Sequence, residues 1–217
     1  MNPPTNRNTV SPQEDRRMPE LIDRVFFQQL AAMPAEDVCR RTACTCDGRE
    51  RAYTITLWDR LYRVQPELQR VGPADPAIAP LHPYLELFLV HYLLRANGME
   101  AAGHWISEKD IPGGATFFRG PHAIPSDLIT ARFNNDIERF NRRCEQLQGV
   151  PLSLADASWR FAITPRIPVA VLYWQGDDEF PAEAKVLFDA AIGSFLAADV
   201  VFALAVGICD RLGRERD

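Results

Sequence analysis

The pattern of apolar and polar positions along the chain predicts several amphipathic or buried helices. Apolar residues recur at helical spacing in six stretches, over residues 19–33, 35–42, 84–96, 127–133, 137–147 and 198–213. The stretch "YLELFLVHYLLRANG" is apolar on nearly all sides, which predicts a buried central helix that ends near Gly98. Ser126 and Asp136 stand where helix N-caps are expected, and Gly213 stands where the last helix would stop.

Strand-like stretches come in runs between these helices. The segment "RAYTITLWDRLYRVQP" alternates as a strand pair does, with a turn at Trp58-Asp59-Arg60. Three further strands are predicted in "SWRFAITP", "VAVLYWQG" and "EAKVLFD", and a short strand is expected at Ala115–Arg119. The short link "PRIP" makes the first two of these strands antiparallel. Because strands do not alternate with helices, the predicted class is α+β, an antiparallel sheet of about four to five strands with helices packed on one side.

Length and composition set the expected domain organisation. The opening segment "MNPPTNRNTVSPQEDRR" is polar and offers nothing to bury, so a disordered tail is expected over residues 1–17. Residues 18–217 suit a single domain, since domains usually have about 100–200 residues.

Charge and cysteine content narrow the partners and the compartment. With 24 Lys and Arg against 29 Asp and Glu, the net charge is −5, which argues against a nucleic-acid partner because that function needs a basic face. No apolar run approaches the ~18 residues of a membrane helix, so no membrane partner is expected, and no export signal is recognisable. The five unevenly spaced cysteines then fit reduced thiols in the cytoplasm. The sequence leaves the oligomeric state unknown.

Arginine supplies nearly all of the basic charge, since lysine occurs only at Lys109 and Lys185. Compositional bias of the genome explains this pattern. Recognition of an anion is the alternative, because the planar guanidinium group pairs with carboxylates and phosphates. The alternative requires that several arginines converge in the fold.

Three adjacent acids, Asp177, Asp178 and Glu179, separate two apolar strands. Adjacent carboxylates repel one another, so one of them can hold a raised pKa when the group is partly buried. Such a cluster could bind a divalent cation or supply acid–base chemistry, with Asp178 or Glu179 as the candidate base. The alternative is a solvated turn in which Asp178 or Glu179 caps the segment that Pro181 begins.

The long loop between residues 103 and 127 carries the densest set of chemically active side chains. Loops of this length in a compact domain are uncommon and often functional. Its candidates are His104, Trp105, Glu108, Lys109, Arg119 and His122, among the glycine pair Gly113-Gly114. The two histidines are candidate acids or hydrogen-bonded fillers, and the glycine pair allows either a close ligand approach or a turn. Arg119 or Arg166 would clamp an anion.

Cys39, Cys44 and Cys46 form a C-x4-C-x-C pattern. Zinc sites usually combine two cysteine pairs, and iron–sulfur clusters need three or four thiolates at typical spacings. A fourth ligand would have to come from Cys144, Cys209 or a histidine. No metal site is therefore predicted, these three cysteines remain weak candidates, and the cofactor is unknown. The common hydrolase, P-loop and dinucleotide motifs are absent from the sequence.

Two stretches, "HYLLRANG…GHWISEKDIPGGATFF" and "PRIPVAVLYWQGDDEFPAEAKVLFD", resemble the uncharacterised prokaryotic family DUF3786, a domain of unknown function. The shared pattern is a leucine-rich helix ending in HYLL, a W-I-S and P-G-G loop, and an acidic E-F-P turn before a strand that ends in Phe-Asp. The resemblance extends over nearly the whole ordered chain, residues 20–212. The matching positions are Trp105, Pro112, Gly113, Gly114, Trp174, Asp178, Glu179, Phe180, Pro181 and Asp189.

The family has no established activity. The resemblance therefore points to candidate site residues but to no particular reaction, and it leaves open whether the protein is an enzyme. We expect one pocket between the loop at residues 104–122 and the turn at residues 174–181, binding a small molecule or cofactor. The turn's carboxylates could instead anchor backbone amides of the loop or Arg119. The family's occurrence in anaerobes, with an iron–sulfur segment in some relatives, implies an alternative: a non-catalytic protein-interaction or assembly module for an anaerobic redox or cofactor system.

Overall fold

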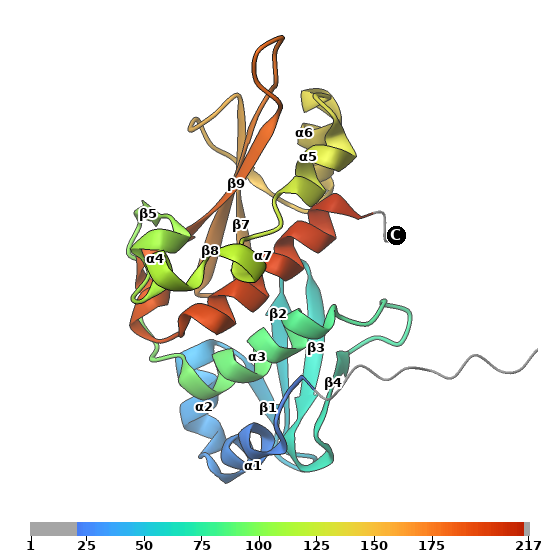
Figure 1. Cartoon of the computed structure of the whole chain (residues 1–217). Coiled ribbons are helices and arrows are strands. Elements are labelled where there is room, and N and C mark those ends of the chain that lie inside the picture. Colours follow the sequence, from blue (N-terminus) through green and yellow to red (C-terminus); the bar gives the residue numbers. More distant parts are fainter. Residues whose placement is uncertain (1–20, 215–217) are drawn as a thin grey trace, which may run out of the picture.

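The computed structural model describes residues 21–214, which form two lobes, one above the other in Figure 1. Each lobe is built on one antiparallel sheet with helices beside it. The α+β class predicted from the sequence is confirmed. The strands divide between two sheets, of four and five strands, instead of forming a single sheet. The tail predicted over residues 1–17 lies outside the described residues.

The first lobe runs from α1 to α3. Its sheet has the strand order β1-β2-β3-β4, and every neighbouring pair is antiparallel. In chain order its elements are α1 (Arg24–Ala32), α2 (Ala35–Thr42), β1 (Thr45–Asp47), β2 (Ala52–Leu57), β3 (Arg60–Gln65), the 3-10 helix η1 (Pro66–Leu68), β4 (Arg70–Pro73) and α3 (Pro83–Arg95). On β2, Tyr53, Ile55 and Leu57 are buried, as their alternation in the sequence predicts.

The second lobe holds the remaining elements, and its sheet has the antiparallel order β5-β9-β8-β7-β6. They are β5 (Trp105–Ile106), η2 (Glu108–Asp110), α4 (Gly114–Phe117), η3 (Gly120–His122), α5 (Asp127–Phe133), α6 (Ile137–Gln146), β6 (Val150–Pro151), β7 (Ala157–Thr164), β8 (Ile167–Trp174), β9 (Glu183–Asp189), η4 (Ala190–Ser194) and α7 (Ala198–Gly213). The central strand β8 is buried from Ile167 to Tyr173, which explains its unbroken apolar sequence.

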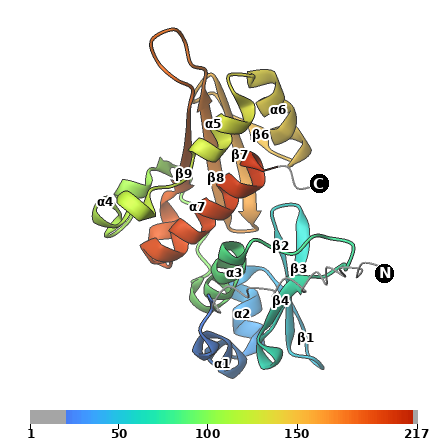
Figure 2. The ribbon, with the colours of Figure 1, turned by 45° about the vertical axis from the view of Figure 1, so that its right-hand side comes forward.

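Helix α7 connects the two lobes. It packs against α3 of the first lobe and α5 of the second (Figure 1 and Figure 2). Gly207 permits the close crossing with α3, because a Cβ at this position would lie 2.3 Å from Leu85 Cγ. One cluster of buried apolar side chains therefore runs through both lobes. With 16 residues α7 is the longest helix described, and no helix among residues 21–214 is both long and apolar enough to cross a membrane.

The hairpin between β2 and β3 makes a second connection between the lobes. At its tip Trp58 adopts a φ of 63°. Its backbone N–H donates to Ile163 O (2.6 Å) and its indole Nε1–H donates to Leu147 O (3.0 Å). The Arg211 guanidinium lies 5.2 Å from the Trp58 ring centroid and forms an ion pair with Asp59. The tip of a first-lobe hairpin is thereby bound to α7 and to the second sheet.

Several short elements differ from the sequence prediction. The strand predicted at Ala115–Arg119 is wrong: this stretch begins in the one-turn helix α4, which follows the left-handed residue Gly113 at φ 76°. The buried helix α3 ends at Arg95, short of Gly98, which also has a positive φ. Strands β1, β4 and β6 are edge strands of two to four residues and were not predicted, because so short a stretch carries no readable alternation.

Candidate functional site

The loop predicted to contact a ligand is fixed at its start by the end of β9. Its strand β5 pairs with β9 through Trp105 opposite Asp189 and Ile106 opposite Phe188. The Asp189 side chain is 4% exposed and accepts three backbone hydrogen bonds. Two come from the loop, Ala102 N (2.8 Å) and Gly103 N (2.8 Å), and one comes from the helix η4 that follows. A buried acid of the second motif therefore anchors the loop.

The glycine pair of the loop has a packing role in this structure. Gly113 takes a positive φ at the start of α4. Gly114 is buried, and a Cβ there would lie 2.0 Å from the backbone oxygen of Glu108. Just before, Ser107 and Asp110 form a reciprocal capping box around η2. The pair therefore allows η2 and α4 to pack closely, and Gly114 has no room for a ligand beside it.

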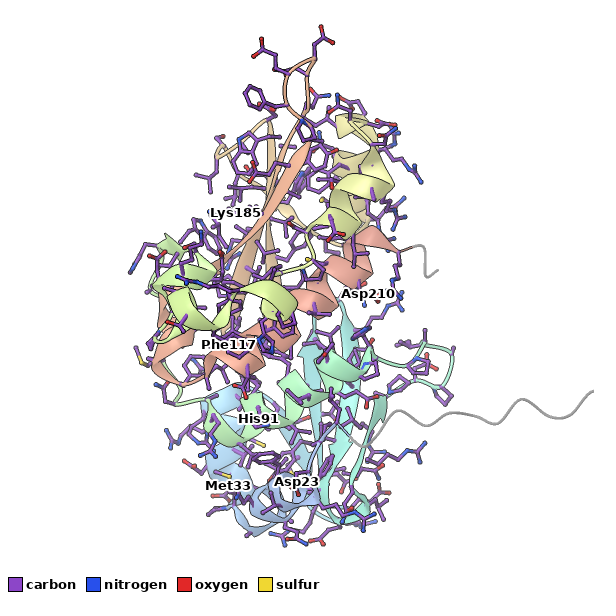
Figure 3. The ribbon with its side chains drawn as sticks, in the orientation of Figure 1. Asp23, Met33, His91, Phe117, Lys185 and Asp210 are labelled. Atoms are coloured by element: carbon purple, nitrogen blue, oxygen red, sulfur yellow. The ribbon has the colours of Figure 1, made fainter. Side chains whose placement is uncertain are left out.

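Beyond the glycine pair the loop presents aromatic rings to α7. Phe117 and His122 stack at a centroid distance of 4.4 Å and an interplanar angle of 17°. Phe202 on α7 meets both of them edge-on, at 6.2 Å from Phe117 and 5.5 Å from His122. Tyr84 on α3 contacts Phe202 from the other side at 6.0 Å. Phe117 is labelled in Figure 3, where α4 lies beside α7.

These rings surround a cavity of about 430 Å³. We call it the aromatic cleft; its lining residues are Tyr84, Leu87, Phe117, Pro121, His122, Asp199, Phe202 and Ala203. Tyr84, Phe117 and Phe202 are half-buried, whereas His122 and Asp199 are exposed at the cavity. A cleft of this size with apolar walls and two polar groups has the composition typical of small-molecule sites. One carboxylate beside several aromatic rings favours a ligand that carries positive charge.

The acidic turn, residues 174–181, lies at the tip of the long β8–β9 hairpin, which projects from the top of the molecule in Figure 1. The Asp177 carboxylate accepts hydrogen bonds from the N–H groups of Glu179 and Phe180, both at 2.8 Å. These bonds, with Phe180 contributing most, lower the pKa of Asp177 below its usual value. Asp178 and Glu179 are exposed, and Phe180 is 67% exposed. The turn is therefore exposed, as the solvated-turn alternative predicts, but the acid that closes it is Asp177 instead of Asp178 or Glu179.

The first residues of the acidic turn are held by Asn135, between α5 and α6. Its side-chain amide bonds both backbone groups of Gly176, and its backbone oxygen accepts from the Gln175 side chain (3.0 Å). A separate, open cavity of about 440 Å³ lies here, between the turn and α5, and Asp177 and Phe180 line it. The acidic turn and the loop thus line two different cavities.

The loop and the turn meet opposite ends of β9. The turn precedes Glu183, whereas β5 pairs at Phe188 and Asp189, roughly 20 Å along the strand at about 3.3 Å per residue. Lys185, labelled in Figure 3, lies on β9 between them. The structure therefore does not bring the candidate bases Asp178 and Glu179 to the histidines of the loop.

The other candidates are also dispersed. His104 is exposed and its backbone oxygen accepts from Ala190 N (3.1 Å). Trp105 and Trp174 are half-buried on β5 and at the end of β8, and Arg119 is exposed. Arg166, in the β7–β8 turn, forms an ion pair with Glu100 and donates to the backbone oxygen of Arg40 (3.3 Å), so it ties the second sheet to the first lobe. His122 alone among the candidate catalytic residues lines the aromatic cleft.

Cys39, Cys44 and Cys46 lie near one another, but no further metal ligands are arranged beside them among the described residues. Cys44 Sγ lies 3.5 Å from Cys39 Sγ, and Cys46 is half-buried near them. Burial raises the pKa of the Cys44 thiol to about 12, so this sulfur is held as a thiol at neutral pH. Among residues 21–214, no group of three or more His, Cys, Asp or Glu side chains is arranged to hold a metal ion.

Sequence reasoning missed the residues that complete the aromatic cleft. Tyr84 and Phe202 belong to helices whose apolar pattern predicts core positions, and Asp199 lies in the first turn of α7. Each meets the loop only through tertiary packing. The only sequence signal was the unusual length of the loop itself.

A match to a known family model shows which family the chain belongs to. The family model described as Domain of unknown function (DUF3786) matches residues 34–211. The chain belongs to this family. The match confirms the resemblance seen in the two sequence motifs, and both DUF3786 motifs lie within the matched range. No curated protein and no solved structure matches the chain.

Proposed function

We propose that this DUF3786 protein binds a small molecule with a flat, positively charged group in the aromatic cleft. The observation that carries the proposal is the arrangement of Phe117, His122, Phe202 and Tyr84 around one cavity, with Asp199 as the carboxylate at its edge. Ring faces attract cations by about 0.5–2 kcal/mol each, and a nearby carboxylate adds to that attraction. The pocket expected from the sequence has the loop as one wall and the acidic turn as the other. In the aromatic cleft the loop is again one wall, but α3 and α7 form the other.

The rigidity of the cleft supports binding. Phe202 and Tyr84 come from two long helices that pack against each other, and the loop is anchored through Asp189. A ligand therefore meets side chains whose positions are set before it arrives, which limits the entropy lost on binding. We place this function in the cytoplasm, where the five unpaired cysteines, with Cys39 and Cys44 adjacent, fit a reducing environment.

An interaction module, the alternative function, needs one continuous apolar face. The exposed large apolar side chains of the described residues are scattered instead, over α1, β3, η1, β6, the acidic turn and three further loop positions. The cleft is the more specific feature, so small-molecule binding is the function we favour.

Benzamidine, a flat ring with one positive charge, is the probe for this proposal. Calorimetric or ligand-detected NMR titration at pH 7 should give saturable binding. Phe202→Ala and Asp199→Asn should each weaken it about five- to ten-fold, as expected for the loss of roughly 1 kcal/mol of cation–π or charge attraction. Benzoate, with the same ring and the opposite charge, should bind more weakly than benzamidine.

Phe180→Ala is the matched control, because it removes an aromatic ring from the cavity at the acidic turn. It should leave benzamidine binding unchanged. If Phe180→Ala weakened binding and Phe202→Ala did not, the ligand site would lie at the acidic turn. If benzamidine showed no saturable binding, the proposal would be overturned.

A further inference from the structure

Three of the five cysteines lie near one another in the first lobe, where α2 leads into β1 (Figure 1). Cys39 belongs to α2, Cys44 lies between the two elements, and Cys46 is the middle residue of β1. We call these three residues the thiol cluster. The aromatic cleft is lined by α3, α7 and the loop, so the thiol cluster is separate from the site of the proposed function.

The backbone between Cys39 and Cys44 brings their sulfur atoms together. Residues five apart do not face each other along a continuous helix, because only positions three or four apart are neighbours there. Helix α2 ends at Thr42, and the next residue, Ala43, is left-handed with φ 57° and ψ 31°. This turn brings Cys44 back beside the end of α2, where its thiol donates to the Cys39 sulfur at 3.5 Å.

Buried hydrogen bonds hold this turn in place. The Thr42 hydroxyl donates to Val38 O at 2.7 Å, and Thr42 O accepts the hydroxyl of Tyr92 on α3 at 3.1 Å. Thr42 and Tyr92 are both fully buried. The two sulfur atoms are therefore placed beside each other before any reaction. Groups held in this way react with each other far faster than the same groups free in solution.

The third thiol, Cys46, lies beside this pair and makes a different contact. Side chains alternate along a strand, so Cys44 and Cys46 are on one face, and Thr45 between them is exposed on the other. Cys46 pairs with the buried Tyr53 of β2, and its thiol donates to Asp47 O at 3.7 Å. Cys46 is therefore a neighbour of the reactive pair and not one of its members.

Exposure sets the order in which the paired thiols meet a reagent. Cys39 is half-buried, whereas Cys44 is 8% exposed. Burial also raises the pKa of the Cys44 thiol to about 12, so Cys44 keeps its proton until a reaction removes it. A reagent from solution therefore reacts with Cys39 first, and Cys44 reacts second from its position beside it.

We propose that Cys39 and Cys44 form a reversible disulfide by exchange with a low-molecular-weight disulfide. The Cys39 thiolate attacks one sulfur of the reagent, so a mixed disulfide forms and half of the reagent leaves as a thiol with the proton that Cys39 lost. Cys44 then displaces the other half, which leaves with the Cys44 proton. The two cysteines lose two electrons, and the reagent disulfide gains them and becomes two thiols. A dithiol reductant reverses both steps.

The surrounding structure can accommodate this bond. A disulfide is about 2.05 Å long, so the sulfur atoms of Cys39 and Cys44 must approach by about 1.5 Å. Cys44 immediately precedes β1, which is a three-residue strand at the edge of its sheet. A small shift there leaves the central strands in place, so the bond forms without unfolding the first lobe. Such transient disulfides occur in cytoplasmic proteins, where they act in redox sensing or catalysis.

Incubation of the reduced full chain with glutathione disulfide tests the proposal, followed by alkylation in urea, trypsin digestion and mass spectrometry. We expect one disulfide per chain and its loss on addition of dithiothreitol. Trypsin cuts after Arg40 and Arg41, between Cys39 and Cys44, and leaves Cys44 and Cys46 on one peptide. A disulfide from Cys39 to Cys44 therefore joins two peptides, whereas one from Cys44 to Cys46 lies within a single peptide.

Cys46→Ser is the matched control, because it removes the neighbouring thiol and leaves the pair intact. Its two peptides should be joined with a yield within two-fold of the parent protein. Cys44→Ser should abolish the disulfide and leave one glutathione bound at Cys39, and Cys39→Ser should abolish both products. If Cys44→Ser fails to fold, the joined peptides of Cys46→Ser still identify the bond. Absence of a disulfide in the parent protein, its loss in Cys46→Ser, or an equal yield of disulfide in Cys44→Ser would overturn the proposal.

Discussion

The carboxylate of Asp189 holds the backbone of Gly103, because Asp189 Oδ2 accepts the Gly103 N–H at 2.8 Å. Gly103 lies within the first of the two quoted sequence motifs and Asp189 ends the second, and this bond is one of three that the carboxylate accepts. The sequence suggested that carboxylates of the acidic turn anchor backbone amides of the loop or Arg119. The acid that holds the loop is instead Asp189, at the far end of β9 from that turn.

Asp189→Ala should therefore lower the stability of the whole protein. Three backbone N–H groups lose a buried, charged acceptor, for which we expect a cost of about 3 kcal/mol and a Tm lower by roughly 6–12 °C. Asp189→Asn keeps one acceptor oxygen and should lose less. Differential scanning calorimetry measures both. Asp178→Ala, at the exposed tip, is the control and should leave Tm unchanged; an equal loss there would contradict the anchoring role of Asp189.

The titration of Glu86, on α3, should make the stability of the protein fall as pH rises. Burial raises the pKa of this carboxyl to about 7 from 4.5. The folded protein therefore keeps a proton that the unfolded chain releases, so this group's contribution to stability is complete below pH 4.5 and is lost as pH rises through 7.

Glu86→Gln should remove that loss. At pH 8 the variant should be more stable than the parent protein by roughly 1 kcal/mol, after allowance for solvent screening of a half-buried side chain. The gain should vanish at pH 4. Urea unfolding across this range measures it, with Glu145→Gln, an exposed site on α6, as the control. A gain independent of pH would rule out the titration of Glu86 as its cause.

The ion pair between Asp59 and Arg211 should couple the lobes measurably. Its side chains are 15% and 17% exposed, so solvent screens them weakly. A double-mutant cycle with Asp59→Asn and Arg211→Gln should give a coupling of about 1–3 kcal/mol in urea unfolding. The pair Glu50–Arg63, at 2.9 Å but 56% and 35% exposed, is the matched comparison and should couple by under ~1 kcal/mol. Equal couplings would show that burial has no influence here.

Cysteine alkylation should follow burial. Burial raises the pKa of Cys44 and Cys209 to about 12 and that of Cys144 further, so very little thiolate is available at pH 8. These three thiols should resist iodoacetamide in the folded protein, whereas Cys39 and Cys46 are half-buried and should react first. Mass spectrometry of timed samples measures this order. Rapid labelling of Cys209 in the native state would show that α7 opens readily.

Sequence reasoning succeeded where local pattern alone decides the structure. The alternation of Tyr53, Ile55 and Leu57 gave the buried face of β2, and the Asp136 side chain caps α6 by accepting the Arg139 N–H at 2.8 Å. Helix α7 likewise begins at Ala198 and ends at Gly213, as its apolar run predicts. In each case the cause lies within a few residues of its effect.

Sequence reasoning failed for features that depend on strand register and tertiary packing. The division into two sheets depends on which strands pair, and β5 joins the second sheet only because Trp105 meets Asp189. The expected pocket between loop and turn required both to reach the same end of β9, and strand length separates them. The aromatic cleft depends on the way Phe202 on α7 meets Phe117 across the loop. No spacing in the sequence encodes these relationships.

The hydrogen bonds between Asp189 and the loop also set an order in which parts of the protein can fold during synthesis on the ribosome. Among the described residues, strands β1 to β4 pair only with one another and are complete by Pro73, so the first sheet can form while the rest of the chain is still being made. Gly103 must wait for Asp189, which is translated 86 residues later. Contacts between residues far apart in the sequence form slowly. The loop and the aromatic cleft that it lines are therefore among the last parts of the protein to fold.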